Sequence, residues 1–125
     1  MYRVAVQRDF FARHYLIGGD YGTENDHHSH HWVLELELEG QKLNREGFLV
    51  DMFDLDENLD QRVAVYEEQT LNDLKLFAGV NPSPENFARI LCEELANEIY
   101  ADHISKITVK LWQDDSTWAS YSIER

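Results

Sequence analysis

Polar and apolar residues alternate in four segments of the chain, with the period of two that is typical of β-strands. The first covers residues 2–11, and the second covers residues 32–40, where leucines alternate with glutamates. Two more alternating segments, residues 107–111 and 117–123, end the chain. We interpret the glutamate row of the second segment as the solvated face of a sheet whose leucine face is buried.

Between these pairs of strands, the apolar residues recur every three or four positions, which predicts two helices. The first helix runs from about residue 51 to residue 66, and its expected buried stripe is Met52, Leu55, Leu59, Val63 and Tyr66. The second begins with Ser83 as a plausible N-cap, Pro84 at the first helical position and Glu85 near the positive end of the helix dipole. Its expected stripe is Phe87, Leu91, Leu95 and Ile99.

The order strand, strand, helix, helix, strand, strand predicts an α+β fold. We expect a four-stranded antiparallel sheet with two helices packed on one face, built from residues 1–125 as one domain. Such a sheet has two open edges, and open edges tend to pair with another chain. We therefore expect a homo-oligomer in which several chains close a ring or barrel.

Composition narrows the functional classes. The chain has 125 residues, with 11 Lys and Arg against 24 Asp and Glu, so its formal net charge is −13. This charge disfavours nucleic acid as a partner, because phosphates require a basic surface. No apolar run approaches the roughly 18 residues of a membrane span, and Arg3 and Arg8 argue against a signal peptide. The single cysteine, Cys92, cannot form an internal disulfide, so we expect a cytoplasmic protein.

Four of the six histidines lie between residues 27 and 31. An expression tag is disfavoured because the cluster is internal, whereas a run of solvated loop histidines stays open. If the second strand extends back to His28, then His28 and His30 project from the same face. His14, after the first strand, is the leading candidate for a third ligand. Three histidines around a tetrahedral zinc leave one position open, which is the catalytic arrangement.

Several motifs resemble those of one family. "DFFARHYL" at residues 9–16 and "HSHHW" at residues 28–32 are similar to the F-x-A-x-H and H-G-H-x-(Y/W) signatures of the 6-pyruvoyltetrahydropterin synthase and 6-carboxytetrahydropterin synthase family. The resemblance continues through "GFLVDMFDL" (47–55), "LNDL" (71–74), "NPSPENFARIL" (81–91) and "LWQDDSTWASY" (111–121). It thus covers nearly the whole chain, in order.

The resemblance implies the T-fold, in which four antiparallel strands and two helices assemble into a multimeric barrel, here a trimer or hexamer. It also implies zinc held by His14, His28 and His30. The implied activity is that of a lyase acting on the pterin substrate 7,8-dihydroneopterin triphosphate. Zinc would lower the pKa of the bound side-chain hydroxyls, while a nearby base moves protons between carbon and oxygen.

Four residues depart from the family pattern, at positions 24, 67, 68 and 113. Glu24 stands where the family commonly has its catalytic cysteine, and members with Glu in this region tend to form 6-hydroxymethyl-dihydropterin. Glu67 and Glu68 stand at the relay Asp and His positions, where they are either an acid pair of altered pKa or an ordinary solvated pair. Gln113 replaces the Glu that anchors the pterin ring in the family, and the neighbouring Asp114 could take that role through a small register shift.

Three functions remain open after these departures. The first is a zinc-dependent pterin lyase with Glu24 as its base. The second is a catalytically altered or inactive member that binds metal and a pterin-like ligand. The third lies outside the resemblance and is a cytosolic protein whose histidine cluster buffers or senses zinc. Cys92 is interpreted as a structural residue beside the core stripe of the second helix.

Overall fold

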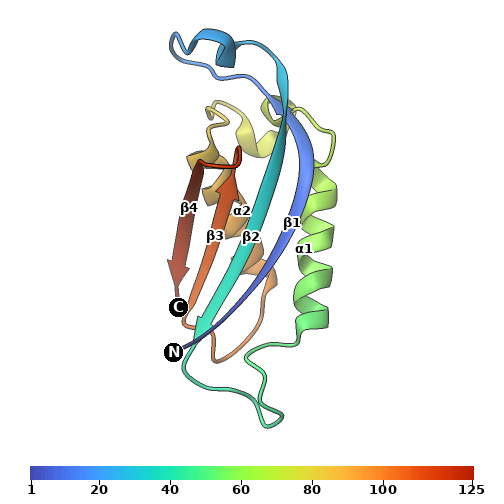
Figure 1. Ribbon diagram of the computed structural model, residues 1–125, viewed down its shortest axis with the longest axis vertical. Helices are drawn as coiled ribbons and strands as arrows, with labels where there is room; N and C mark the ends of the chain where they lie inside the picture. Colours follow the sequence, from blue (N-terminus) through green and yellow to red (C-terminus); the bar gives the residue numbers. More distant parts are fainter.

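The computed structural model describes residues 1–125, and its elements follow the predicted order (Figure 1). The strands are β1 (Tyr2–His14), β2 (His28–Gly40), β3 (Lys106–Trp112) and β4 (Trp118–Glu124), and the helices are α1 (Met52–Tyr66) and α2 (Pro84–Glu98). Three short 3₁₀ turns, which the sequence pattern did not predict, are η1 (Gly22–Asn25), η2 (Leu71–Asp73) and η3 (Lys75–Phe77).

The four strands form one antiparallel sheet in the order β1-β2-β3-β4. Both helices lie on the same side of this sheet, with α1 beside β1 and α2 behind β3 and β4 (Figure 1). The predicted α+β class, with its two-layer arrangement of sheet and helices, is therefore confirmed.

Both helices begin at the capping residues that their sequences provide. The Asp51 carboxylate accepts from the backbone N–H of Phe53, and the Ser83 hydroxyl accepts from the backbone N–H of Asn86. Pro84 occupies the first turn of α2, where the proline lacks only an N–H that would have no helical partner. The predicted start of α2 is thus confirmed.

The core lies between the inward face of the sheet and the two helices, and Phe87 of α2 is at its centre. The Phe87 ring packs edge-on against Phe10, Trp32, Tyr66 and Phe77, with centroid separations of 5.2–6.0 Å. The predicted stripe of α2 is buried at all four positions. In α1 the buried stripe is smaller than predicted, because Met52, in the first turn of the helix, is 36% exposed.

The outward face of the sheet carries charged pairs and is less uniformly solvated than the glutamate row predicts. Glu39 is only 7% exposed, because it lies between Arg3 on β1 and Lys106 on β3. Glu35 likewise accepts from Gln7 and faces Lys110. Cationic side chains on β1 and β3 therefore cover part of the glutamate row of β2, which the sequence pattern predicts to be open to water.

Three connections meet at one end of the sheet: the β1–β2 loop, the α1–α2 connection and the β3–β4 turn (Figure 1). Both chain termini lie toward the opposite end. No helix combines the length and the apolar character that crossing a bilayer requires.

Candidate metal centre

The register of β1 against β2 brings three histidines together. His14 is paired directly with His28, and Ala12 is paired with His30. The first strand therefore continues three residues beyond its predicted end at Phe11, which places His14 within β1. Side chains at these positions share the inward face, since residues two apart project from the same side. The ring centroids of His28 and His30 lie 4.7 and 4.9 Å from that of His14.

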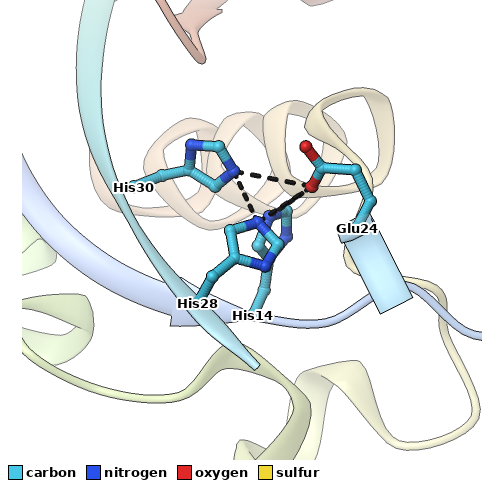
Figure 2. A group of neighbouring side chains, drawn as sticks. All are labelled: His14, Glu24, His28 and His30. Carbon is cyan, nitrogen blue, oxygen red and sulfur yellow. Dashed lines mark hydrogen bonds and ion pairs between the residues drawn. The ribbon is translucent and has the colours of Figure 1, made fainter. Parts of the chain in front are cut away.

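Glu24 reaches the same point from the β1–β2 loop. It lies on the 3₁₀ turn η1, and its carboxylate points into the three imidazoles (Figure 2). Its Oε2 atom is 2.8 Å from Nε2 of His28, 3.7 Å from Nε2 of His30 and 3.9 Å from Nε2 of His14. These four residues form the histidine–glutamate cluster.

Backbone carbonyls orient two of the imidazoles. The Nδ1–H of His14 donates to the carbonyl of Pro82 at 2.7 Å, and the Nδ1–H of His28 donates to the carbonyl of Asp26 at 2.5 Å. With the proton on Nδ1, the Nε2 lone pair of each ring is free to point into the cluster. Such a hydrogen bond behind a histidine is the usual way in which a metal ligand is held in the required tautomer.

The atoms at the centre of the cluster fit a small cation. Nε2 of His28 and Nε2 of His30 are 2.7 Å apart, and all four ligand atoms lie within 4.8 Å of one another. Nε2 of His14 and Oε2 of Glu24 are buried without a hydrogen-bond partner. A tetrahedral zinc with bonds of about 2.0–2.1 Å separates its ligand atoms by roughly 3.3 Å, which falls among the observed separations. A divalent ion would satisfy both orphaned atoms at once.

Burial keeps two of these histidines neutral. It lowers the pKa of His14 to about 4, although the hydrogen bond to Pro82 acts in the opposite direction. The pKa of His30 is also lowered, by burial first and then by the neighbouring His28. Metal binding requires the deprotonated imidazole, so these shifts remove the competition with protons at neutral pH.

Of the two residues expected at the pterin ring, only Gln113 lies against the cluster. Its Nε2 is 3.1 Å from Nε2 of His30. The Asp114 carboxylate is instead occupied within the β3–β4 turn, where it accepts from the backbone N–H groups of Ser116 and Thr117. The hydrogen bond from Ser116 is the main cause of the lowered pKa of Asp114.

The structure does not bring the two expected relay residues to the cluster. Glu67 caps the end of α1, and Glu68 follows in a left-handed conformation with φ of 62°. The Glu68 carboxylate pairs with Arg13 at 3.2 Å, on the exposed edge of β1. The imidazole near this segment is that of His27, whose Nε2 is 2.9 Å from the Thr70 hydroxyl.

Sequence reasoning missed the groups that hold the loops around the cluster. The side chain of Asn72 binds both the N–H and the carbonyl of Tyr15, and that of Asn81 accepts from the N–H of Ile17. No pattern signals the carbonyls of Asp26 and Pro82, because any residue supplies a carbonyl. The asparagines could have been suspected only from their place between predicted elements.

Two cavities differ in their relation to this site. A cavity of about 390 Å³ has Gln113, Glu85 and Trp118 in its wall and so adjoins the cluster. The larger cavity, about 540 Å³, lies between the start of α1 and the end of α2, away from the histidines. We associate the smaller cavity with the site because Gln113, one of its wall residues, lies against His30 of the cluster. Cys92 is buried, its thiol donates to the carbonyl of Ile107, and burial raises the pKa of this thiol to about 11, which disfavours the reactive thiolate.

Comparison with known families agrees with this arrangement. The model of the family described as 6-pyruvoyl tetrahydropterin synthase matches residues 3–124. The chain belongs to this family. No curated protein sequence matches the chain. The resemblance inferred from the motifs is therefore confirmed over nearly the whole chain.

Solved structures of tetrahydropterin synthases share the fold. The 6-pyruvoyl tetrahydropterin synthase of Caenorhabditis elegans superposes with a TM-score of 0.80 at 21% identity, over 97% of this chain and 96% of that one. The Plasmodium vivax enzyme gives 0.82 at 13% identity, over 99% and 98%. Structures of the P. vivax protein also exist with a glutamate, described as a catalytic residue, replaced by alanine or cysteine.

The likeness extends to a second kind of pterin protein. Dihydroneopterin aldolase of Escherichia coli, in complex with neopterin, superposes with a TM-score of 0.57 at 15% identity, over 100% of this chain and 99% of that one. At these identities the structural matches establish the fold alone.

Proposed function

We propose that this member of the tetrahydropterin synthase family is a zinc-dependent lyase acting on 7,8-dihydroneopterin triphosphate. The observation that carries the proposal is the convergence of three Nε2 atoms and one carboxylate oxygen within 4.8 Å. His14, His28 and His30 would hold the metal, each through Nε2. Zinc supplies a Lewis acid that lowers the pKa of hydroxyl groups on the substrate side chain.

Glu24 is the base in this proposal. Its Oε2 lies 2.8–3.9 Å from the three metal-binding nitrogens, so it is within reach of hydroxyl or C–H groups held there. The carboxylate would take a proton from a side-chain carbon and return it at a neighbouring carbon or oxygen. The catalytic glutamate of the P. vivax synthase supports a carboxylate in this role.

The pterin ring would occupy the cavity of about 390 Å³ next to the cluster. Gln113, in its wall, has an amide that can donate to and accept from the polar edge of a pterin. A neutral amide gives a weaker bond than the charge-assisted bond of a carboxylate. Asp114 could contribute only if it left the turn in which it now accepts three hydrogen bonds.

A second candidate is a family member that binds metal and a pterin-like ligand with altered or lost catalysis. Glu67 and Glu68 favour it, because both carboxylates lie outside the cluster and Glu68 is paired with Arg13. Within one chain, the proposed site therefore has a candidate base and residues that could hold a metal, but no second acid–base group from the expected relay positions.

Incubation with zinc and dihydroneopterin triphosphate, followed by mass spectrometry of the products, tests the proposal. We expect release of triphosphate by the wild type and a fall of at least about 100-fold in kcat for Glu24→Ala, as for loss of a general base. The matched control is Glu46→Gln, which removes a carboxylate from the exposed loop after β2.

One outcome would contradict the lyase and another would contradict the role of Glu24. One is the absence of any turnover while pterin binding is tight, which supports the second candidate. The other is turnover that survives Glu24→Ala unchanged, which would remove Glu24 from the reaction.

A further inference from the structure

The larger cavity, of about 540 Å³, lies at the end of the molecule opposite the histidine–glutamate cluster (Figure 1). Three segments form its wall: the loop after β2, the first turns of α1, and the end of α2 with the residues that follow it. No residue of a strand lines this cavity, so the sheet edges can pair with other chains through other residues. A role for the cavity is therefore separate from the metal centre and from closure of a barrel.

The wall of this cavity combines buried apolar side chains with acidic ones. Leu49, Leu55 and Ile99 are the buried members, with 2–5% of their surface exposed. The wall contains no lysine or arginine, and its one imidazole is that of His103. We call it the acidic cavity, after the five carboxylates of Asp51, Asp54, Glu57, Glu98 and Asp102. A ligand bound there meets apolar contact and negative charge together.

The chain itself neutralises only part of this charge. Arg62 pairs with Glu98, and the Asp51 carboxylate accepts from the backbone at the start of α1. Lys42 and Arg45 precede the cavity in the loop after β2, but neither belongs to its wall. The remaining three carboxylates are exposed and form no ion pair within the chain: those of Asp54, Glu57 and Asp102.

The end of α2 adds to the negative potential of the acidic cavity. The last turn of the helix contains Glu98 and no basic residue, although the helix dipole favours cations there. Arg125 offsets part of this potential, since it donates to the carbonyls of Ala96 and Ile99. An acidic side chain at this end of a helix is unfavourable, so a bound cation would stabilise the arrangement.

Large apolar side chains are exposed around the acidic cavity. Tyr100, in its wall, is 91% exposed, and Phe48 and Phe53, which neighbour wall residues in the sequence, are 57% and 72% exposed. Exposed apolar side chains with a polar surround are typical of protein interaction sites. The surface therefore suits a partner that extends beyond the cavity, such as a polypeptide.

We propose that the acidic cavity is a docking site for a partner protein, which inserts a segment carrying lysine or arginine beside an apolar side chain. The buried leucines and isoleucine of the wall would contact the apolar side chain. The unpaired carboxylates would face the cations, and such charge complementarity speeds association and selects the partner. This role is independent of the proposed lyase.

The basic residues of this chain do not supply such a segment, so the partner is a different protein. Of the 11 lysines and arginines, seven form ion pairs within the chain. Arg125 binds backbone carbonyls, which leaves only Lys42, Arg45 and Lys75. The net charge of −13 also opposes the approach of two copies through their acidic surfaces.

A basic amphipathic peptide is the probe for this docking site. It has about 14 residues, with leucines on one face of a helix and lysines on the other, and fluorescence anisotropy of a label on the peptide measures its binding. We expect the double variant Asp54→Asn, Asp102→Asn to bind it at least about tenfold more weakly than the wild type. The matched control is Asp73→Asn, Asp115→Asn, which removes the same charge from exposed positions outside the wall and should keep wild-type affinity.

The apolar contribution is tested separately. We expect Tyr100→Ala to weaken peptide binding by at least about fivefold, since large aromatic side chains dominate such interfaces. Leu76→Ala, which removes a 54% exposed side chain from the α1–α2 connection, should have no effect. Circular dichroism checks that each variant is folded.

Four outcomes would overturn the proposal. Absence of peptide binding by the wild type is the first, and an equal loss in both double variants, which indicates general attraction to an acidic protein, is the second. The third is that spermidine binds as tightly as the peptide and with the same dependence on Asp54 and Asp102, which would make the cavity a site for small polycations. The fourth is loss of self-association in the cavity variant by light scattering, which would make a second copy the occupant.

Discussion

His14 is the residue on which the cluster depends most. Its side chain is fully buried, its ring packs edge-on against Trp32 at 5.3 Å, and Pro82 accepts its Nδ1 proton. Each of these contacts comes from a different element, so the ring has little freedom to rotate. The remaining ring nitrogen, Nε2, is buried and has no hydrogen-bond partner.

Replacing His14 should abolish metal binding. We expect His14→Ala to lower zinc affinity by at least about 100-fold, because a buried ligand is lost along with its neighbours' alignment. The matched control is His31→Ala, whose imidazole lies on the outward face and pairs with Asp9 at 2.7 Å. Zinc content after dialysis measures both. Retention of zinc by His14→Ala would favour a loop-only histidine site.

The lowered pKa of His14 predicts acid sensitivity of the metal-free protein. Because the folded pKa is about 4 and the unfolded value 6.5, the unfolded state binds more protons between these limits. Stability should therefore fall as pH decreases, by about 2 kcal/mol between pH 7 and pH 5 from this residue. Urea unfolding in the presence of a chelator measures the free energy at each pH.

His14→Phe is the control for this pH dependence. The variant has no group that titrates in this range at position 14, so the fall from pH 7 to pH 5 should be smaller by that amount. Equal falls in the two proteins would contradict a neutral, buried His14.

At the scale of elements, the start of α2 links helix capping to the metal centre. The Pro82 carbonyl that orients His14 immediately precedes the N-cap Ser83. Phe87 fixes the same helix to the core one turn later. The orientation of one imidazole of the cluster thus depends on where a helix begins.

Loss of the cap should therefore weaken both the helix and the site. We expect Ser83→Ala to cost about 1 kcal/mol of unfolding free energy, since the N–H of Asn86 loses its acceptor. Ser122→Ala, at an exposed position of β4, should change stability by less than about 0.5 kcal/mol. Chemical denaturation of both variants measures the difference. A cost no larger than that of Ser122→Ala would argue against the cap.

For the whole molecule, Phe87 is the residue that joins the two layers. It contacts aromatic rings from β1, β2, α1 and the α1–α2 connection. We expect Phe87→Ala to destabilise the fold by about 3–5 kcal/mol through the cavity it leaves. Phe53→Ala, whose side chain is 72% exposed, should cost far less. Thermal unfolding of the two variants would reveal whether Phe87 is central.

The sheet edges predict self-association. Residues 68–70 cover only part of β1, through bonds from the N–H of Glu68 to Phe11 and from the N–H of Arg13 to Gln69. The rest of β1 and all of β4 have no further strand beside them. Because such edges pair with other chains, we expect self-association, and the family resemblance sets the mass expected in light scattering at that of a trimer or hexamer. A monomer at micromolar concentration would contradict closure by several chains.

The periodicity of apolar residues was sufficient to predict the strands and helices and the face of each that is buried. A strand buries every second residue and a helix every third or fourth, so the spacing of apolar residues in the sequence shows which positions are buried. The leucine face of β2 and the Phe87 stripe of α2 could therefore be predicted. Met52 and Glu39 could not, because their exposure depends on which neighbours cover them.

By itself, the sequence determined the two-layer fold, the shared face of His28 and His30, and membership of the tetrahydropterin synthase family. Only the tertiary structure decided that Glu24 meets the three imidazoles, that Pro82 orients His14, and that Glu67 and Glu68 lie outside the cluster. The physical reason is how far apart in the sequence the interacting residues lie. Local patterns record which face of an element is buried, whereas contacts between loops form only when the strands and helices that carry them have packed.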